Sequence, residues 1–319
     1  MTALAIMIFL AFMALVTAVI YGRITWMSAT DRIEGIAALD AAQFGRDEIA
    51  DLVKNFGTME SALTRQMADI SEMTAEREKT RAELSIATRI QMSMIPTDFS
   101  GMPCDINGSM TPAREVGGDV YDFFRLDDGR VALVMADVSG KGVPAAMFMT
   151  ISRTLIRQRA AQGGTPAKML EDVNTQLCMT NREMLFVTVW LGIADLQTGR
   201  VAYCNAGHEY PVVLNGNGAE ILEARPNDPP LGLSEDIELT DRELMLGEHD
   251  GLFIYTDGLP EAKDAAGDRY GMERLIQLLK HVGRDADCAS VVNTVRNDYI
   301  SFLQDIEPFD DMTMLLIRR

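Results

Sequence analysis

The 319-residue chain has few cysteines and histidines and comparatively little positive charge. Its four cysteines form no CxxC pair and have no spacing typical of a metal site, which indicates reduced thiols in a cytosolic domain. With 29 Lys and Arg against 47 Asp and Glu, the net charge is −18. Nucleic-acid phosphates and anionic lipid headgroups repel such a chain. We therefore expect no nucleic-acid partner and no membrane adhesion through surface charge.

Charged residues are absent between Ala3 and Tyr21. As a helix this apolar run spans roughly 28 Å, about the thickness of a bilayer core. It is longer than the apolar region of a signal peptide and has no basic region before it, which favours a membrane anchor. Arg23 and Arg32 follow it, so the positive-inside rule places the rest of the chain in the cytoplasm. We expect a transmembrane helix at residues 1–22 of a single-pass protein of the cytoplasmic membrane.

Proline is missing and glycine is scarce from residue 23 to about residue 82, which favours helix. An amphipathic stretch, Ile24–Leu39, precedes a second one, Asp47–Leu63, whose apolar residues recur at three- and four-residue steps. Two short helices joined by a connector just inside a membrane resemble a HAMP signalling module, which we place at residues 23–67. The first helix lacks the proline that HAMP modules usually have after the membrane.

The apolar stripe continues through Met67, Ile70 and Met73, and the segment ends at Pro96. Such a stripe predicts a coiled-coil signalling helix at residues 68–92. A parallel coiled coil joins two copies of a chain, so we expect a homodimer formed through this linker.

Four aspartates stand where a strand ends or begins beside a small-residue turn: Asp119 in VGGDVYDF, Asp137 in ADVSGKG, Asp257 in YTDG and Asp310 in DDMT. Two of them follow the apolar runs Val131–Ala136 and Leu252–Tyr255, which are typical of buried strands. Converging carboxylates repel each other unless cations neutralise them. Hard oxygen ligands favour Mg²⁺ or Mn²⁺ over zinc or copper. The sequence therefore predicts a metal-dependent hydrolase.

The motifs occur in the order ATRIQMSMIP, PAREVGGDVYDFF, ADVSGKGVPAAMFM, FVTVWLGIAD, YCNAGHEYP, LGL, LFIYTDGLPEA, YGMERL and DDMTMLLI. Together they resemble the SpoIIE/RsbU-type phosphatases of the metal-dependent Ser/Thr protein phosphatase (PPM) superfamily. The resemblance implies a phosphatase domain at residues 93–319 with an α+β fold, a PPM-type α/β/β/α sandwich of two mostly antiparallel sheets flanked by helices.

The residue patterns agree with a layered sandwich independently of the resemblance. Further strands are predicted at Phe186–Asp195, Arg200–Asn205 and Pro211–Leu214. Helices are predicted at Pro144–Ala160, Pro166–Met184, Met272–Val282 and Ala289–Leu303. Runs of strands between helices fit an α+β sandwich better than a regular βαβ alternation.

The resemblance also implies a site for two Mn²⁺ or Mg²⁺ ions. Asp137 would bridge both ions with the Val138 carbonyl adding an oxygen, Asp119 would complete one shell, and Asp257 and Asp310 would hold the other ion. No protein nucleophile is required, because two ions that share a water can activate it for in-line attack. Asp311 is the alternative to Asp310, and we favour Asp311 as a supporting neighbour.

Five other positions are open to two interpretations each. Arg114 and Lys141 either contact the substrate phosphate or are surface charges. His208 in NAGH is either a general acid or a histidine bonded to a neighbouring turn, and the latter is commoner. The glycines of VGGD either permit close backbone approach or a positive φ, or form a solvated turn.

The resemblance implies that the substrate is a phosphorylated regulatory protein, an anti-anti-sigma-type factor. The competing hypothesis is a catalytically inactive module that binds a phosphoregulator. Retention of all four aspartates argues against it. A GGDEF-type nucleotide cyclase is set aside, because VGGDVYDF lacks the EF that follows GGD in that family.

Overall fold

The computed structural model describes residues 46–222, 228–282, 286–304 and 306–319. Compact packing divides the chain into two units, Met1–Arg81 and Ala82–Arg319. In the described ranges, no helix is both long enough and apolar enough to cross a membrane. The membrane helix predicted at residues 1–22 lies outside the described residues, as does the first helix of the predicted HAMP-like module.

Helix α3 (Arg46–Met94) runs without interruption through the second predicted HAMP helix and the predicted signalling helix. It ends two residues before Pro96, as expected from the restricted backbone of a residue that precedes proline. Large apolar side chains along α3 are exposed to solvent: Met59, Leu63, Met67, Ile70 and Met73. The last turns of the helix belong to the second unit.

Two five-stranded antiparallel sheets form the second unit. The first has the order β1-β10-β9-β6-β7. Its strands are β1 (Asp105–Thr111), β10 (Met312–Arg318), β9 (Gly251–Tyr255), β6 (Val212–Asn215) and β7 (Gly218–Ile221). The second has the order β2-β3-β4-β5-β8. Its strands are β2 (Val120–Arg125), β3 (Val131–Val138), β4 (Val187–Ala194), β5 (Arg200–Ala206) and β8 (Arg242–Met245).

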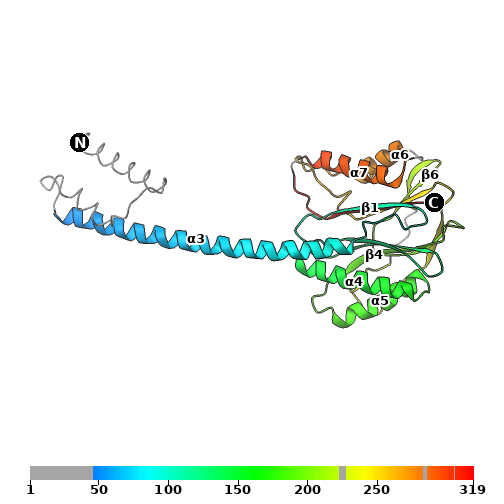
Figure 1. The fold of residues 1–319 in the computed structure, drawn as a ribbon, viewed down its shortest axis with the longest axis horizontal. Helices are drawn as coiled ribbons and strands as arrows, with labels where there is room; N and C mark the ends of the chain where they lie inside the picture. The colour runs from blue at the N-terminus through cyan, green and yellow to red at the C-terminus, as the bar shows by residue number, and fades with distance from the viewer. Residues whose placement is uncertain (1–45, 223–227, 283–285, 305) are drawn as a thin grey trace. The chain divides into compact units, whose positions relative to one another are not determined.

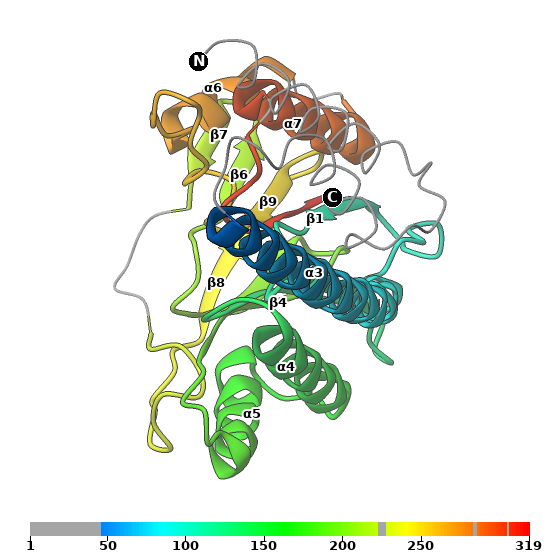
Figure 2. The same cartoon turned by 90° about the vertical axis from the view of Figure 1, so that its left-hand side faces the viewer.

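Four helices cover the outer faces of the sheets (Figures 1 and 2). They are α4 (Val143–Ala161) and α5 (Pro166–Thr180) on the second sheet, and α6 (Met272–Val282) and α7 (Cys288–Leu303) on the first. Three apolar clusters follow from this arrangement. One lies under each helix pair, and the third lies between the two sheets around Trp190 and Met135. The predicted α/β/β/α sandwich of antiparallel sheets is confirmed.

Local sequence explains where three of these helices begin. Prolines occupy the first turns of α4 and α5, where the missing amide donor is tolerated. Thr165 accepts a hydrogen bond from the Lys168 amide at the start of α5, and Asp287 accepts one from Ser290 at the start of α7.

One predicted helix is too long. α5 ends at Thr180 rather than at Met184, because the Asn181 side chain turns the chain. The Asn181 amide group donates to the Leu185 and Gly232 carbonyls, and its oxygen accepts from the Leu185 amide. Side-chain bonding of this kind competes with helix continuation.

Candidate active site

The predicted aspartates gather where an end of the first sheet meets an end of the second sheet. In the second sheet, Asp119 directly precedes β2 and Asp137 lies near the end of β3. These two strands are antiparallel, with Val120 paired to Ala136, so both carboxylates stand at one end. In the first sheet, Asp257 follows β9, and Asp310 and Asp311 precede its neighbour β10. All the predicted carboxylates thus come from two adjacent strands of each sheet.

Buried hydrogen bonds join the two sheets at this end. Thr256, at the end of β9, donates its hydroxyl proton to Asp119 Oδ2 at 2.7 Å. Asp311 accepts from the backbone amides of Ala113 and Gly118 at 2.8 and 2.7 Å. A charged acceptor on an amide donor is stronger than a neutral pair, so these bonds fix the VGGD loop against β10.

Asp310 and Asp311 differ in their surroundings. Asp311 is buried, and its carboxylate is occupied by backbone amides. Asp310 is partly exposed and its Oδ2 atom lies 2.8 Å from Lys141 Nζ. These contacts give Asp311 a role in supporting the VGGD loop, whereas the carboxylate of Asp310 pairs with a lysine.

Gly117 and Gly118 are buried close to other groups, so of the two interpretations close backbone approach is confirmed. A Cβ atom on Gly117 would lie 2.3 Å from Asp311 Oδ2, and one on Gly118 would lie 2.9 Å from the Val138 carbonyl oxygen. No side chain larger than hydrogen fits there without displacing the carboxylate or the strand.

The carboxylates disturb each other electrostatically. Burial, followed by the charge of Asp257, raises the pKa of Asp137 to about 7, and a hydrogen bond to Asp119 partly offsets the effect. Burial and the charges of Asp137 and Asp311 raise the pKa of Asp119 well above its ordinary value. Burial and the charge of Asp310 raise the pKa of Asp257. Clustered buried carboxylates with raised pKa values are typical of functional sites.

The donor set fits small divalent cations. Among the described residues, no three Asp, Glu, His or Cys side chains are arranged to hold one metal ion as they stand. Mg²⁺, however, is usually bound through one or two protein carboxylates, with water and substrate phosphate completing its shell. All the donors here are carboxylate or carbonyl oxygens, and the mutual repulsion of the carboxylates is what cations would relieve.

The two predicted phosphate-contacting cations lie in different places. Lys141 lies in the turn between β3 and α4, where it pairs with Asp310 and its Nζ atom is 3.7 Å from the centre of the Phe309 ring. It also donates to the Phe309 carbonyl. Arg114 is exposed, in the segment between β1 and the VGGD loop. Lys141 is therefore the cation that the structure places among the carboxylates.

His208 is buried, and both of its ring nitrogens are engaged. Nε2 lies 3.1 Å from the Tyr255 carbonyl, which can only accept, so Nε2 carries the proton. Nδ1 then accepts from the Thr188 hydroxyl at 2.9 Å. Burial lowers the pKa of His208 to about 4. This histidine joins β4, β5 and β9 and has no free nitrogen to serve as a general acid.

The buried His208 predicts a specific pH dependence of stability. Its pKa is about 4 in the folded chain against 6.5 for a free histidine, so the unfolded chain binds the proton first as the pH falls. Its contribution is fully present above pH 6.5 and declines as the pH falls toward 4. In urea unfolding, the advantage of the wild type over His208→Gln should shrink by about 2 kcal/mol between pH 7 and pH 5.

The exposed histidine of α6 supplies the control. His281→Gln should unfold in parallel with the wild type over the same pH range, since its ring is on the helix surface. An equal gap between wild type and His208→Gln at both pH values would contradict the assignment.

Two contacts of the site were not anticipated from the sequence. The Thr256 hydroxyl, which bonds Asp119, also accepts from the Thr313 amide at 3.1 Å. Gln91 in α3 donates to the Gly117 carbonyl at 2.6 Å and accepts from the Gly117 amide at 3.1 Å. Nearby, Thr88 donates to the Glu115 carbonyl. Thr256 and Gln91 belong to sequence motifs of the phosphatase domain, but only the tertiary fold shows which residues they bond.

The family model described as Stage II sporulation protein E (SpoIIE) matches residues 127–319, more than half of the chain. The chain belongs to the SpoIIE family. The match extends from the start of β3 through β10 and includes three of the four predicted aspartates, so the resemblance seen in the sequence motifs is confirmed.

Relatives of this SpoIIE-family chain include phosphatases. Phosphoserine phosphatase RsbU of Bacillus subtilis is 25% identical over 248 residues, 76% of this chain and 72% of RsbU. Protein IcfG of Synechocystis sp. is 27% identical over 302 residues, 86% of this chain and 46% of IcfG. The chain therefore spans less than half the length of IcfG.

A solved structure supports the same fold. The SiaA-PP2C domain of Pseudomonas aeruginosa superposes with a TM-score of 0.69 at 20% identity and covers 77% of this chain and 99% of that domain. At that identity the likeness shows the fold alone, and it assigns the SpoIIE-family sandwich to the PP2C type.

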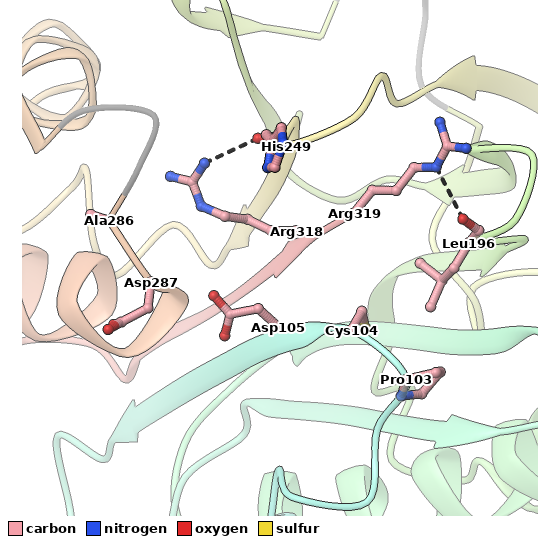
Figure 3. Close-up of a pocket in the computed structure, with 9 residues that line it drawn as sticks. All are labelled: Pro103, Cys104, Asp105, Leu196, His249, Ala286, Asp287, Arg318 and Arg319. Carbon is pink, nitrogen blue, oxygen red and sulfur yellow. Dashed lines mark hydrogen bonds between the residues drawn. The ribbon is translucent and has the colours of Figure 1, made fainter.

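A separate cavity of about 480 Å³ lies at the end of β10 remote from Asp311 (Figure 3). Asp105 and Arg318, which are paired in register across β1 and β10, both line it, and Arg318 donates to the His249 carbonyl at 3.2 Å. None of the residues predicted from the SpoIIE motifs lies there. The cavity is thus distinct from the carboxylate cluster.

Proposed function

We propose that this chain is a Mn²⁺- or Mg²⁺-dependent protein phosphatase that hydrolyses phosphoserine or phosphothreonine on a regulatory protein. The observation that carries the proposal is the convergence of buried aspartates from both sheets, whose charges raise each other's pKa. Membership of the SpoIIE family and similarity to a phosphoserine phosphatase support the reaction type.

Two ions would be held by Asp119, Asp137 with the Val138 carbonyl, Asp257 and Asp310. When bound, they would supply an activated water and positive charge toward the phosphate. The chain itself contributes rigid strand ends that hold the carboxylates and, in Asp311, an acceptor that fixes the VGGD loop. Lys141, which pairs with Asp310, would contact a phosphate oxygen. His208 donates its Nε2 proton to the Tyr255 carbonyl, so solvent would protonate the leaving alkoxide.

The substrate and setting follow from the sequence resemblance. We assign the substrate to the anti-anti-sigma-type phosphoproteins, and the membrane helix at residues 1–22 would hold the catalytic domain at the cytoplasmic face of the membrane. The exposed apolar residues of α3 support a homodimer through the linker, because their three- and four-residue steps match a coiled-coil seam.

The contact between α3 and the VGGD loop supports control by the linker. Gln91 bonds both polar backbone groups of Gly117, two residues before Asp119. A shift of the helix would displace Gly117 and with it the Asp119 carboxylate. Signals would therefore reach the site through the last turns of α3.

Replacement of Gln91 tests this control. Gln91→Leu keeps the volume but removes both bonds and leaves two buried backbone groups unpaired, so kcat for p-nitrophenyl phosphate should fall by about 10-fold or more. The Mn²⁺ concentration for half-maximal activity should rise, which a purely structural role would not cause. Gln66→Leu, on an exposed face of the same helix, is the control and should leave both values unchanged.

The proposal as a whole is tested by phosphate release from a phosphoserine peptide and from p-nitrophenyl phosphate. The full chain would be assayed in detergent with Mn²⁺, with Mg²⁺ and with EDTA. We expect turnover of both substrates that depends on the divalent cation. Absence of turnover while the folded chain still binds the phosphopeptide would favour the inactive phosphoregulator-binding module instead.

A further inference from the structure

Large apolar side chains are exposed on the segments around the Ser139–Gly142 turn, which follows Asp137. Met147 is 63% exposed, Met184 81% and Phe309 84%, and Val143 and Leu233 are also exposed. We refer to these five residues as the rim patch. Apolar side chains gathered on a surface mark interaction sites more often than isolated ones do.

Hydrogen bonds tie two segments of the rim patch to the turn. Helix α4 begins directly after Gly142 and carries Val143 and Met147 on one face, four residues apart. Ser139 donates its amide to the Phe186 carbonyl at 2.8 Å, and its hydroxyl accepts from the Phe186 amide at 2.9 Å. Met184 therefore lies two residues from Phe186, which precedes β4 and is bonded to the Ser139–Gly142 turn.

The other two residues of the rim patch, Leu233 and Phe309, are held near the same turn. The Asn181 side chain bonds both the Leu185 and Gly232 carbonyls, which holds Leu233 beside the loop that carries Met184. Phe309 lies under the ammonium group of Lys141, the central residue of the turn. The rim patch thus lies on segments that adjoin the Ser139–Gly142 turn after Asp137: the start of α4, the 181–186 loop with the neighbouring Leu233, and Phe309 next to Asp310.

Met184 is held in an unfavourable backbone conformation. Its φ is 55°, in the left-handed region where a residue with a Cβ atom is strained. The Met184 side chain is mostly exposed to water, so in the free chain no burial of apolar surface offsets the backbone strain. A glycine would relieve the strain, so neither the backbone conformation nor packing within the fold accounts for the methionine side chain.

We propose that the rim patch is a docking surface for the segment of the phosphoprotein substrate that carries apolar side chains next to the phosphoserine or phosphothreonine. A phosphorylated residue that reaches Asp137 brings its neighbours over the Ser139–Gly142 turn and onto this surface. A second copy of the chain seated there would block that approach. The proposal rests on the proposed phosphatase function and adds that the enzyme prefers substrates with apolar residues next to the phosphorylated residue. Methionine and aromatic side chains are enriched at such interfaces, whereas the excess of carboxylates at the site disfavours acidic partners.

Two phosphoserine peptides of equal length and net charge test the proposal, one with leucine and isoleucine on both sides of the phosphoserine and one with glycine and serine. The full chain should show about 10-fold higher kcat/KM for the apolar peptide. Met184→Gly should reduce this ratio to about 2-fold while leaving turnover of p-nitrophenyl phosphate unchanged. Since glycine suits the left-handed conformation, this variant should unfold at no lower urea concentration than the wild type, which excludes misfolding as the cause.

A second variant and a control complete the design. Met147→Ser should lower the same ratio, and Met245→Ser, equally exposed at the edge strand β8, should not. Equal turnover of both peptides by the wild type would overturn the proposal. So would a change from dimer to monomer in Met184→Gly with the peptide ratio intact, which would assign the rim patch to contact between copies. If the phosphatase proposal itself failed, no p-nitrophenyl phosphate would be hydrolysed, and fluorescence anisotropy of labelled peptides would still show whether the apolar peptide binds more tightly.

Discussion

Replacement of Asp137 by asparagine is expected to lower kcat/KM for p-nitrophenyl phosphate by at least about 1000-fold, which corresponds to about 4 kcal/mol of lost transition-state stabilisation. Asp137 lies within the electrostatic field of the other carboxylates, since the charges of Asp257, Asp310 and Asp311 all raise its pKa. Asparagine keeps the shape but removes the negative charge that would hold both ions. The assay is initial-rate hydrolysis over a Mn²⁺ series, so that weakened ion binding is separated from lost turnover.

The same substitution should not weaken the fold. In EDTA the Asp137 carboxylate faces other carboxylates, so its removal relieves repulsion, and the free energy of unfolding should be unchanged or higher. Asp128→Asn, in the exposed turn between β2 and β3, is the matched control and should retain full activity. Near-normal turnover by Asp137→Asn would rule out the proposed two-ion mechanism.

Replacement of Asp122 by asparagine should have the opposite profile, with a large loss of stability and little change in chemistry. Asp122 in β2 is 1% exposed and pairs with Arg153 and Arg157 of α4 at 3.0 and 2.8 Å. Removal of the charge leaves two guanidinium groups without their carboxylate. We expect the free energy of unfolding to fall by about 3 kcal/mol, the lower end of the range for a broken buried pair, because Arg157 is half exposed.

Urea unfolding measures this loss, and Asp128→Asn serves again as the control. Asp128 pairs with Arg130 at the surface, so its replacement should cost no more than about 0.5 kcal/mol. The Asp122→Asn variant, assayed below its unfolding transition, should hydrolyse p-nitrophenyl phosphate within about 3-fold of the wild-type rate. A loss of activity as large as that of Asp137→Asn would place Asp122 in the chemistry rather than in the support of α4.

The sequence predicted the central strands better than the edge strands. β3, β4 and β9 are buried almost throughout, so each is a continuous apolar run. β1 and β8 lie at sheet edges and carry polar residues, as in DINGSMT and RELM, and no apolar run marks them. The bounds of β2 were not predicted because its buried Asp122 interrupts the apolar pattern, and only the arginines of α4 explain how that charge is tolerated.

For the site, the aspartates were recognisable because strand ends and glycine turns are local features. Their supporting contacts were not, since Thr256 bonds Asp119 across 137 residues of sequence and Asp311 bonds Gly118 across 193. The end of α5 was mispredicted for a related reason. The Asn181 side chain bonds Gly232, 51 residues away, and no periodicity reveals that partner.

The position of β10 has a consequence for how the protein is made. β1 pairs only with β10 among the described strands, and β10 also separates β1 from β9. The second sheet has all of its strands once Met245 has been synthesised, whereas the first has to wait for Arg318. Asp311, which fixes the VGGD loop, arrives with that last strand. A nascent chain, or one cut short by premature termination, therefore carries Asp119 and Asp137 in a folded sheet and the other two predicted carboxylates unplaced, and the carboxylate cluster forms only after translation has passed β10.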